Sequence, residues 1–168
     1  MKNVVMAIFF LLSINSFAQE KPQFNFLKKN SVQLDLGGPG LIYSIGYERI
    51  ILNGSRFKTA GKIGAAYYPP ALGFIEVWLP VSVSEIISFG NHHAEVGMGY
   101  TFVNDKYTSA IGEESRKWDG FITPNLSYRY QKPQGRFIFK AGVTPFFERY
   151  AGSYDMHFSG GVVFGYAF

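Results

Sequence analysis

The stretch that decides the fold is the last part of the chain, Met156-His157-Phe158-Ser159-Gly160-Gly161-Val162-Val163-Phe164-Gly165-Tyr166-Ala167-Phe168. Its even positions carry methionine, phenylalanine, valine and tyrosine, broken once by glycine. Its odd positions carry mostly small or polar residues. Side chains of a β-strand alternate between two faces, so this period of two predicts a strand with one face in an apolar medium.

The same period recurs along the chain in seven earlier segments, at 32–36, 43–48, 57–67, 74–81, 93–102, 122–130 and 137–148. No segment shows a convincing helical period. The connections alternate in length: Asn53-Gly54 predicts a tight hairpin turn, whereas the longest loop is expected from Asn104 to Asp119. Short turns on one rim and long loops on the other are typical of membrane barrels. We therefore expect an all-β fold, an eight-stranded antiparallel up-and-down transmembrane β-barrel.

The less hydrophobic face of these strands indicates which side of the barrel is apolar. It holds many glycines and about one charge per strand, which is too few for a surface in water and suits a crowded lumen. Because buried charges persist only when they are paired, we expect a closed ionic network that plugs the lumen. Glu95 and Arg129 lie on neighbouring strands, and Glu48 and Lys58 flank the Asn53-Gly54 turn. The alternative is a narrow ion path. The expected network comprises Asp35, Glu48, Lys58, Lys62, Glu76, Glu95, Arg129, Lys140 and Glu148.

Composition excludes several classes of protein. The 168 residues contain no cysteine, 17% charged and 47% hydrophobic residues. This is one domain by length, too apolar for disorder, and it cannot form disulfides, zinc fingers or iron–sulfur clusters. The net charge of +4 comes without a basic cluster, so no nucleic-acid partner is expected.

The N-terminus has the pattern of a secretory signal peptide. Lys2 precedes an apolar run at 4–12, and small residues lead to a predicted cleavage site between Ala18 and Gln19. The apolar run is too short for a membrane-spanning helix. We expect a signal peptide at 1–18, a short periplasmic segment at 19–30 and an outer-membrane barrel at 31–168.

With these features the chain resembles the small eight-stranded outer-membrane β-barrel proteins of Gram-negative bacteria, over the whole mature chain. The alternating aromatic residues Phe164, Tyr166 and Phe168 at the end resemble the signal read by the barrel-assembly machinery. The segment from Thr123 to Pro145 resembles a hairpin that recurs in uncharacterised barrels. The resemblance implies a monomer in outer-membrane lipid and insertion by that machinery. It implies no activity, because these barrels include adhesins, envelope stabilisers and enzymes.

Catalytic and metal-binding candidates are few. His157 and Ser159 share one face and could suggest a lipid hydrolase, but they point inward and no glutamate follows them; a hydrogen-bonding pair in the lumen is favoured. His92 and His93 are adjacent and so point in opposite directions, as expected of a solvated turn rather than a chelate. Glu113-Glu114 lies beside basic residues, which favours a solvated loop. No cofactor is expected.

These patterns favour a non-enzymatic outer-membrane barrel whose extracellular loop 104–119 is the interaction surface. Two alternatives stay open. One is an outer-membrane enzyme that modifies lipid A or phospholipid, and the other is a secreted soluble barrel that binds an apolar ligand.

Overall fold

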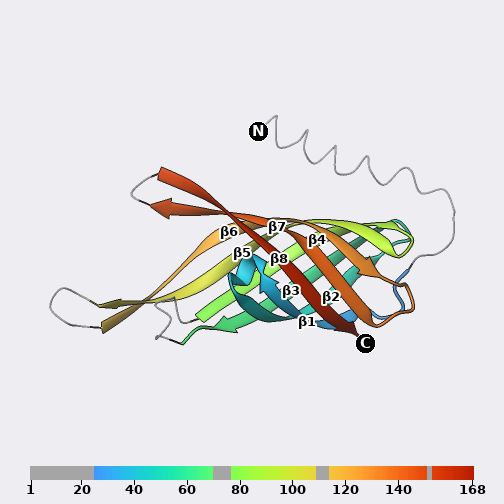
Figure 1. Cartoon of the computed structure of the whole chain (residues 1–168), viewed down its shortest axis with the longest axis horizontal. Helices are drawn as coiled ribbons and strands as arrows, with labels where there is room; N and C mark the ends of the chain where they lie inside the picture. The colour runs from blue at the N-terminus through green and yellow to red at the C-terminus, as the bar shows by residue number, and fades with distance from the viewer. Residues whose placement is uncertain (1–24, 70–76, 109–113, 151–152) are drawn as a thin grey trace.

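The computed structural model describes residues 25–69, 77–108, 114–150 and 153–168, with side chains described except at 105–108, 114–117, 148–150 and 153–155. The chain forms a closed barrel in which each strand pairs antiparallel with the next and β8 returns to β1 (Figure 1). No helix in these ranges is long and apolar enough to cross a membrane. The strands are β1 Asn30–Gly37, β2 Tyr43–Asn53, β3 Phe57–Tyr67, β4 Val77–Phe89, β5 His92–Thr108, β6 Glu114–Gln131, β7 Phe137–Tyr150 and β8 Ser153–Ala167.

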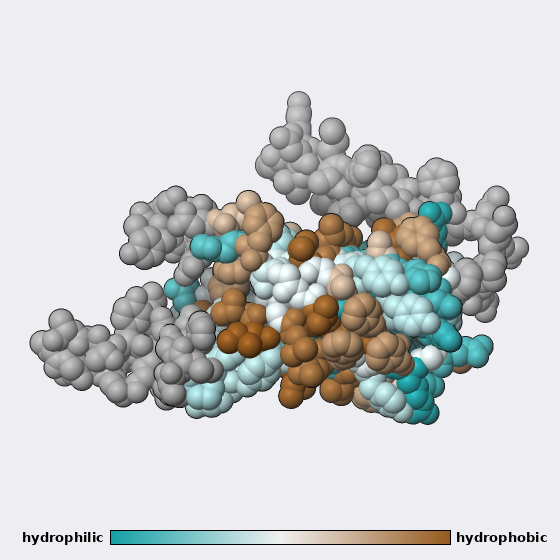
Figure 2. All heavy atoms as spheres, viewed as in Figure 1, coloured by the Kyte–Doolittle hydropathy of each residue, from teal (hydrophilic) through white to brown (hydrophobic). Residues whose placement is uncertain are grey.

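The two faces of the strands carry the side chains that the sequence pattern predicts. In β1, Gln33 and Asp35 are buried in the lumen, whereas Val32, Leu34 and Leu36 are 41–47% exposed on the outside. The other strands continue this inversion, so most large exposed side chains are apolar and most buried ones are polar or charged. Figure 2 shows the apolar side chains gathered around the middle of the barrel. The predicted eight-stranded barrel and its two faces are confirmed.

The predicted loop from Asn104 to Asp119 is wrong in its extent. β5 and β6 remain paired from Asn104–Trp118 as far as Thr108–Glu114, so only 109–113 connect them, outside the described residues. Figure 1 shows this hairpin and the β7–β8 hairpin reaching past the barrel, at the end opposite the C-terminus. Continued pairing satisfies the backbone N–H and C=O groups. The polar composition of this stretch is the reason that a loop was predicted.

The connection at Asn53-Gly54 is also longer than the predicted two-residue turn. Gly54–Arg56 separate the two strands, and the β2–β3 register shifts between Ile50 and Leu52, as at a β-bulge. The Asn53 side chain binds elsewhere: its Oδ1 accepts from the Phe26 N–H at 3.1 Å, and its Nδ2 donates to the Phe26 carbonyl at 2.8 Å. The N-terminal segment is thereby attached to the end of β2.

The connection between β1 and β2 is held by contacts inside the barrel. Its short 3-10 helix η2, Gly38–Gly40, is preceded by Gly37 at φ 82°, a conformation that favours glycine. The Tyr68 hydroxyl donates to the Gly40 carbonyl and accepts from the N–H groups of Ile42 and Tyr43. The Thr101 hydroxyl on β5 donates to the Pro39 carbonyl at 3.3 Å. These contacts place η2 over one end of the lumen.

Candidate functional site

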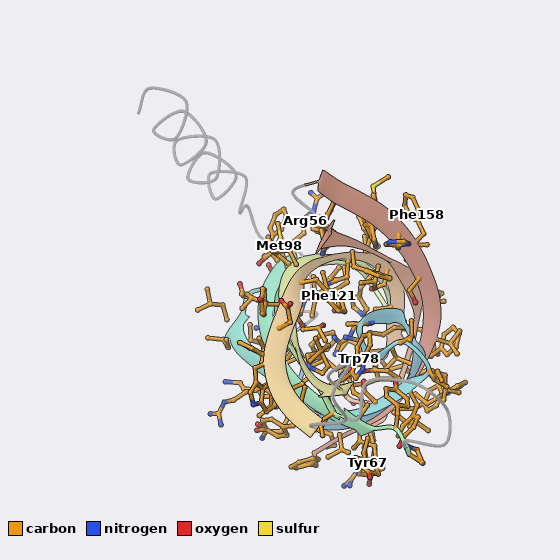
Figure 3. The ribbon with its side chains drawn as sticks, turned by 90° about the vertical axis from the view of Figure 1, so that its left-hand side faces the viewer. Arg56, Tyr67, Trp78, Met98, Phe121 and Phe158 are labelled. Atoms are coloured by element: carbon orange, nitrogen blue, oxygen red, sulfur yellow. The ribbon has the colours of Figure 1, made fainter. Side chains whose placement is uncertain are left out.

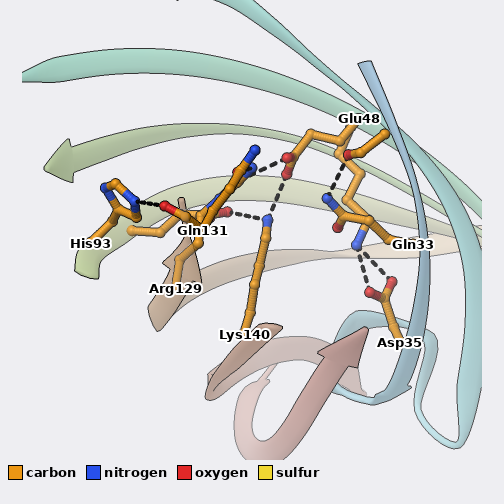
Figure 4. A network of polar contacts seen from close by, with 10 residues as sticks. Gln33, Asp35, Glu48, His93, Arg129, Gln131 and Lys140 are labelled. Carbon is orange, nitrogen blue, oxygen red and sulfur yellow. Dashed lines mark hydrogen bonds and ion pairs between the residues drawn. The ribbon is translucent and has the colours of Figure 1, made fainter. Parts of the chain in front are cut away.

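Four charged side chains from four strands form a closed ring in the lumen. Arg129 Nη1 on β6 lies 2.8 Å from Glu48 Oε1 on β2 and 3.2 Å from Glu95 Oε2 on β5. Lys140 Nζ on β7 lies 2.5 Å from Glu48 Oε2 and 2.9 Å from Glu95 Oε1. Each carboxylate therefore bridges both cations, as Figure 4 shows for Glu48. All four side chains are at most 5% exposed.

The composition of this ionic ring explains how four charges remain inside the barrel. Two carboxylates balance two cations, so the ring carries no net charge. Gln131 Oε1 accepts from Arg129 Nε at 2.9 Å and from Nη2 at 2.5 Å, so every nitrogen of the guanidinium donates a hydrogen bond. Removing one member would leave an uncompensated buried charge, which costs about 3–5 kcal/mol.

A second ion pair lies on the β1–β3 side of the lumen. Lys62 Nζ lies 2.6 Å from Asp35 Oδ1 and donates to Oδ2 at 2.8 Å. The Ser44 hydroxyl donates to the same carboxylate at 2.8 Å. The predicted network is thus divided into a ring and a pair. Glu76 lies outside the described residues, and the side chain of Glu148 is not described.

The suggested association of Lys58 with Glu48 is wrong. The β2–β3 register sets Glu48 opposite Lys62 instead. The Glu48 carboxylate reaches across the lumen and pairs with Arg129 and Lys140. Lys58 Nζ donates to Ser88 Oγ at 2.6 Å and to the Ser55 carbonyl at 3.0 Å. No carboxylate in the described ranges forms a salt bridge with it. It also lies 4.9 Å from the centre of the Phe26 ring.

Phe26 lies inside the lumen at the rim that holds both ends of the described chain, and it is absent from the predicted lumen residues. Its side chain is 1% exposed. The ring lies 5.4 Å from the Arg129 guanidinium and meets the His93 ring edge-on at 5.1 Å. The face of the Phe26 ring thus lies against the cations of Lys58 and Arg129, a favourable arrangement for an aromatic ring. The only signal in the sequence is the apolar group Phe24, Phe26 and Leu27 within the mostly polar segment 19–30.

The other end of the lumen holds a row of aromatic rings. Tyr68, Trp78 and Phe121 contact one another in sequence, with ring centres 6.1 Å and 5.4 Å apart. Figure 3 views the barrel from this end and shows Trp78 and Phe121 inside the ring of strands, with Tyr67 and Phe158 outside. Together with η2, these rings narrow the lumen opposite Phe26.

The histidine and serine candidates are separated from one another. The expected hydrogen-bonding pair of His157 and Ser159 is wrong: the His157 ring stacks on Phe146 at 5.3 Å, and Ser159 Oγ accepts from the Gly38 N–H at 3.0 Å. His157 thus contacts β7, whereas Ser159 contacts η2. These contacts leave neither side chain positioned to activate the other.

The adjacent histidines do point in opposite directions. His93 is not in a solvated turn, because it is buried between Ser88 Oγ and the Gln131 carbonyl, each at 2.9 Å. His92 lies outside, with Nδ1 2.6 Å from the Tyr128 hydroxyl. Glu113 lies outside the described residues, and the side chain of Glu114 is not described. No group of three His, Asp or Glu side chains in the described parts could hold a metal ion.

A small cavity remains between the ionic ring and η2. Its lining includes Asp35, Lys62, Ser84, Asn125 and Lys140. The free volume is about 70 Å³, which holds a few water molecules. Pockets for drug-sized ligands are several times larger, about 300–1,000 Å³. The cavity suits ordered water better than an organic ligand.

Comparison with known proteins finds no matching family model and no matching curated sequence. Solved structures with a similar barrel include the N-terminal β-barrel domain of Pseudomonas aeruginosa OprF, at 15% identity and a TM-score of 0.49, covering 83% of this chain and 99% of that one. Another is Ail, the attachment invasion locus protein of Yersinia pestis, solved with the heparin analogue sucrose octasulfate. It has 10% identity and a TM-score of 0.44, covering 84% and 98%. Likenesses of this size carry no functional assignment.

Proposed function

We propose that this chain is a small, non-enzymatic barrel of the bacterial outer membrane whose lumen is closed. One observation carries the proposal: the barrel buries a ring of four charges and exposes its large apolar side chains. In water such an exterior would far exceed the apolar patches of soluble proteins. In a bilayer the same exterior is favourable, and a closed barrel pairs its backbone groups between strands without an exposed sheet edge.

The aromatic side chains on the outside support membrane insertion. Tyr47, Tyr128 and Tyr166 are 37–53% exposed near the rim that holds the chain ends, and Tyr67 and Tyr100 are exposed toward the other rim. Tyrosines at two levels are typical of the interfaces between hydrocarbon and headgroups. The rim with the short turns would then face the periplasm, and the long hairpins would lie outside the cell.

Three successive obstructions support a closed lumen. Phe26 covers one end, the ionic ring crosses the interior, and η2 with its aromatic neighbours covers the other end. Ions would have to disrupt paired buried charges in order to pass. Purified protein in planar bilayers should therefore show no large, stable unitary currents, and such currents would contradict a closed lumen.

Export and assembly complete the proposal. A signal peptide at 1–18, cleaved between Ala18 and Gln19, would deliver the chain to the periplasm; this segment lies outside the described residues. The exposed side chains of Phe164, Tyr166 and Phe168 would be read by the barrel-assembly machinery. The 104–119 hairpin would then be the surface available to extracellular partners.

Cell fractionation tests the location. The protein should remain with outer membranes after carbonate washing and should require detergent for release. Recovery from the soluble periplasmic fraction would instead favour a secreted soluble barrel. Turnover of lipid A or phospholipid by the purified protein would contradict the non-enzymatic assignment.

A further inference from the structure

The outward-facing lysine and arginine side chains that the structure describes all lie at one rim of the barrel. Among the lysines and arginines whose side chains are described, Lys58, Lys62, Arg129 and Lys140 face the lumen. The others belong to the rim that holds the short turns and the chain ends: Lys28, Lys29, Arg49, Arg56, Lys132 and Arg136. All of these except the half-buried Lys28 are exposed.

The backbones of four of these residues lie in the strands and turns beside the seam where β8 closes on β1. The Lys29 carbonyl accepts from the Ile50 N–H at 2.7 Å, next to Arg49. The Arg136 carbonyl accepts from Ala167 at the end of β8 at 2.6 Å, and Lys132 begins the same turn as Arg136. We name Lys29, Arg49, Lys132 and Arg136 the seam belt. Figure 2 shows hydrophilic residues at this end of the molecule, next to the apolar band.

The seam belt has no acidic counterpart in the described parts of the chain. No described carboxylate forms a salt bridge with any of the four cations. Asp35, Glu48 and Glu95 are buried in the lumen. Glu85 lies on β4, where it accepts from the Thr59 hydroxyl at 2.8 Å. Among the described side chains, therefore, no carboxylate neutralises the four cations of the belt.

The belt also adjoins the apolar surface directly. Arg136 Nη1 donates to the Tyr166 hydroxyl at 2.5 Å, and its guanidinium lies 5.5 Å from the centre of that ring. The Tyr47 hydroxyl donates to Asn30 Oδ1 at 2.7 Å, beside Arg49 in the β1–β2 register. Tyrosine hydroxyls at this level mark the depth of lipid headgroups. Cations at that depth lie closer to the phosphates of lipid headgroups than to molecules in solution.

We propose that the seam belt binds the phosphodiester groups of anionic phospholipids in the leaflet at the turn rim. Arginine offers paired donors to phosphate oxygens, and lysine adds a compact charge. Continuity with the apolar band favours a lipid over an acidic protein, because one molecule can then occupy both surfaces. This inference rests on the proposed membrane-spanning function and adds the lipid class that the barrel selects.

The test compares lipid binding by two variants with the same change in charge. The belt variant carries Lys29→Gln, Arg49→Gln, Lys132→Gln and Arg136→Gln. The control variant carries Lys106→Gln, Arg116→Gln, Lys117→Gln and Arg149→Gln, which removes two lysines and two arginines from the long hairpins instead. Full-length mature protein is inserted in phosphatidylcholine nanodiscs containing a minor share of phosphatidylglycerol, and the co-purifying lipid is quantified by mass spectrometry.

The wild type should enrich phosphatidylglycerol around it, and the control should match the wild type. Each cation near an anionic surface contributes about fivefold to binding. The preference of the belt variant for phosphatidylglycerol should therefore be at least about tenfold weaker than that of the wild type. Arg49→Lys with Arg136→Lys should retain most of it. Circular dichroism of each variant in the same discs establishes that the barrel is folded.

Other outcomes overturn the inference. Equal enrichment by belt variant and wild type, or equal loss in both variants, would exclude a local site. If millimolar inorganic phosphate abolishes the enrichment of phosphatidylglycerol, the belt is a site for free anions and not for lipid. If the wild type inserts in phosphatidylcholine but shows no preference, only this inference fails; if it does not insert at all, the proposed function fails.

Discussion

Replacing Glu95 by glutamine removes one of the two carboxylates that hold the ionic ring together. Glu95 accepts from Arg129 Nη1 at 3.2 Å and from Lys140 Nζ at 2.9 Å. The substitution keeps the volume of the side chain but leaves two cations facing the single carboxylate of Glu48. The ring then carries one uncompensated positive charge in a site where all members are nearly inaccessible to water.

The size of the effect follows from that imbalance. Breaking a buried ion pair costs about 3–5 kcal/mol, and the remaining amide oxygen places this variant at the lower end, about 3 kcal/mol. For a chain of this size, 1 kcal/mol corresponds to about 2–4 °C in melting temperature. Glu95→Gln should therefore lower the midpoint of thermal unfolding by about 10 °C.

The assay is the heat-induced loss of the compact band in SDS gels, checked by circular dichroism in detergent. Glu85→Gln is the matched control, because Glu85 lies on the adjacent strand and its hydrogen bond joins it to Thr59 on the outside of the barrel. The double variant Glu95→Gln with Lys140→Met restores neutrality and should unfold at a higher temperature than the two separate effects would give if they were additive. If Glu95→Gln melts within about 2 °C of Glu85→Gln, the ring does not stabilise the barrel as argued.

Three further changes test the closed lumen and its packing. Phe26→Ala should lower the melting temperature, because it uncovers two cations at one end, but should not give large unitary currents, since the ionic ring and η2 remain; such currents would show that the ring does not obstruct the lumen. Gly142→Ala should destabilise the barrel by about 1–3 kcal/mol, since a Cβ there meets the Leu126 carbonyl at 2.4 Å, whereas Gly160→Ala, whose nearest neighbour is 3.7 Å away, should be neutral in the same melt. Tyr68→Phe removes the hydroxyl that holds η2, so limited proteolysis should cleave the β1–β2 connection faster than in wild type. Equal cleavage rates would show that η2 is held without it.

The local pattern of the sequence contains most of the fold. Side-chain direction in a strand follows from backbone geometry alone, so the alternation in β1 or β8 already separates lumen residues such as Asp35 from outward residues such as Phe164. The extent of the β5–β6 hairpin did not follow, because pairing of backbone groups continues where the side chains no longer alternate.

The partners of each lumen charge depended on the tertiary structure. Glu48 lies 81 residues from Arg129 and 92 from Lys140, on strands that never pair with β2. Only closure of the barrel brings these side chains together, since they meet across the lumen and not along a ladder. Phe26 joins them because backbone contacts to Asn53 and to the β6–β7 turn hold the segment across the mouth. The sequence by itself therefore determined which way the residues of the alternating segments point, a property of one strand. The tertiary structure alone decided which residues meet, since contacts across the lumen depend on the register of all eight strands together.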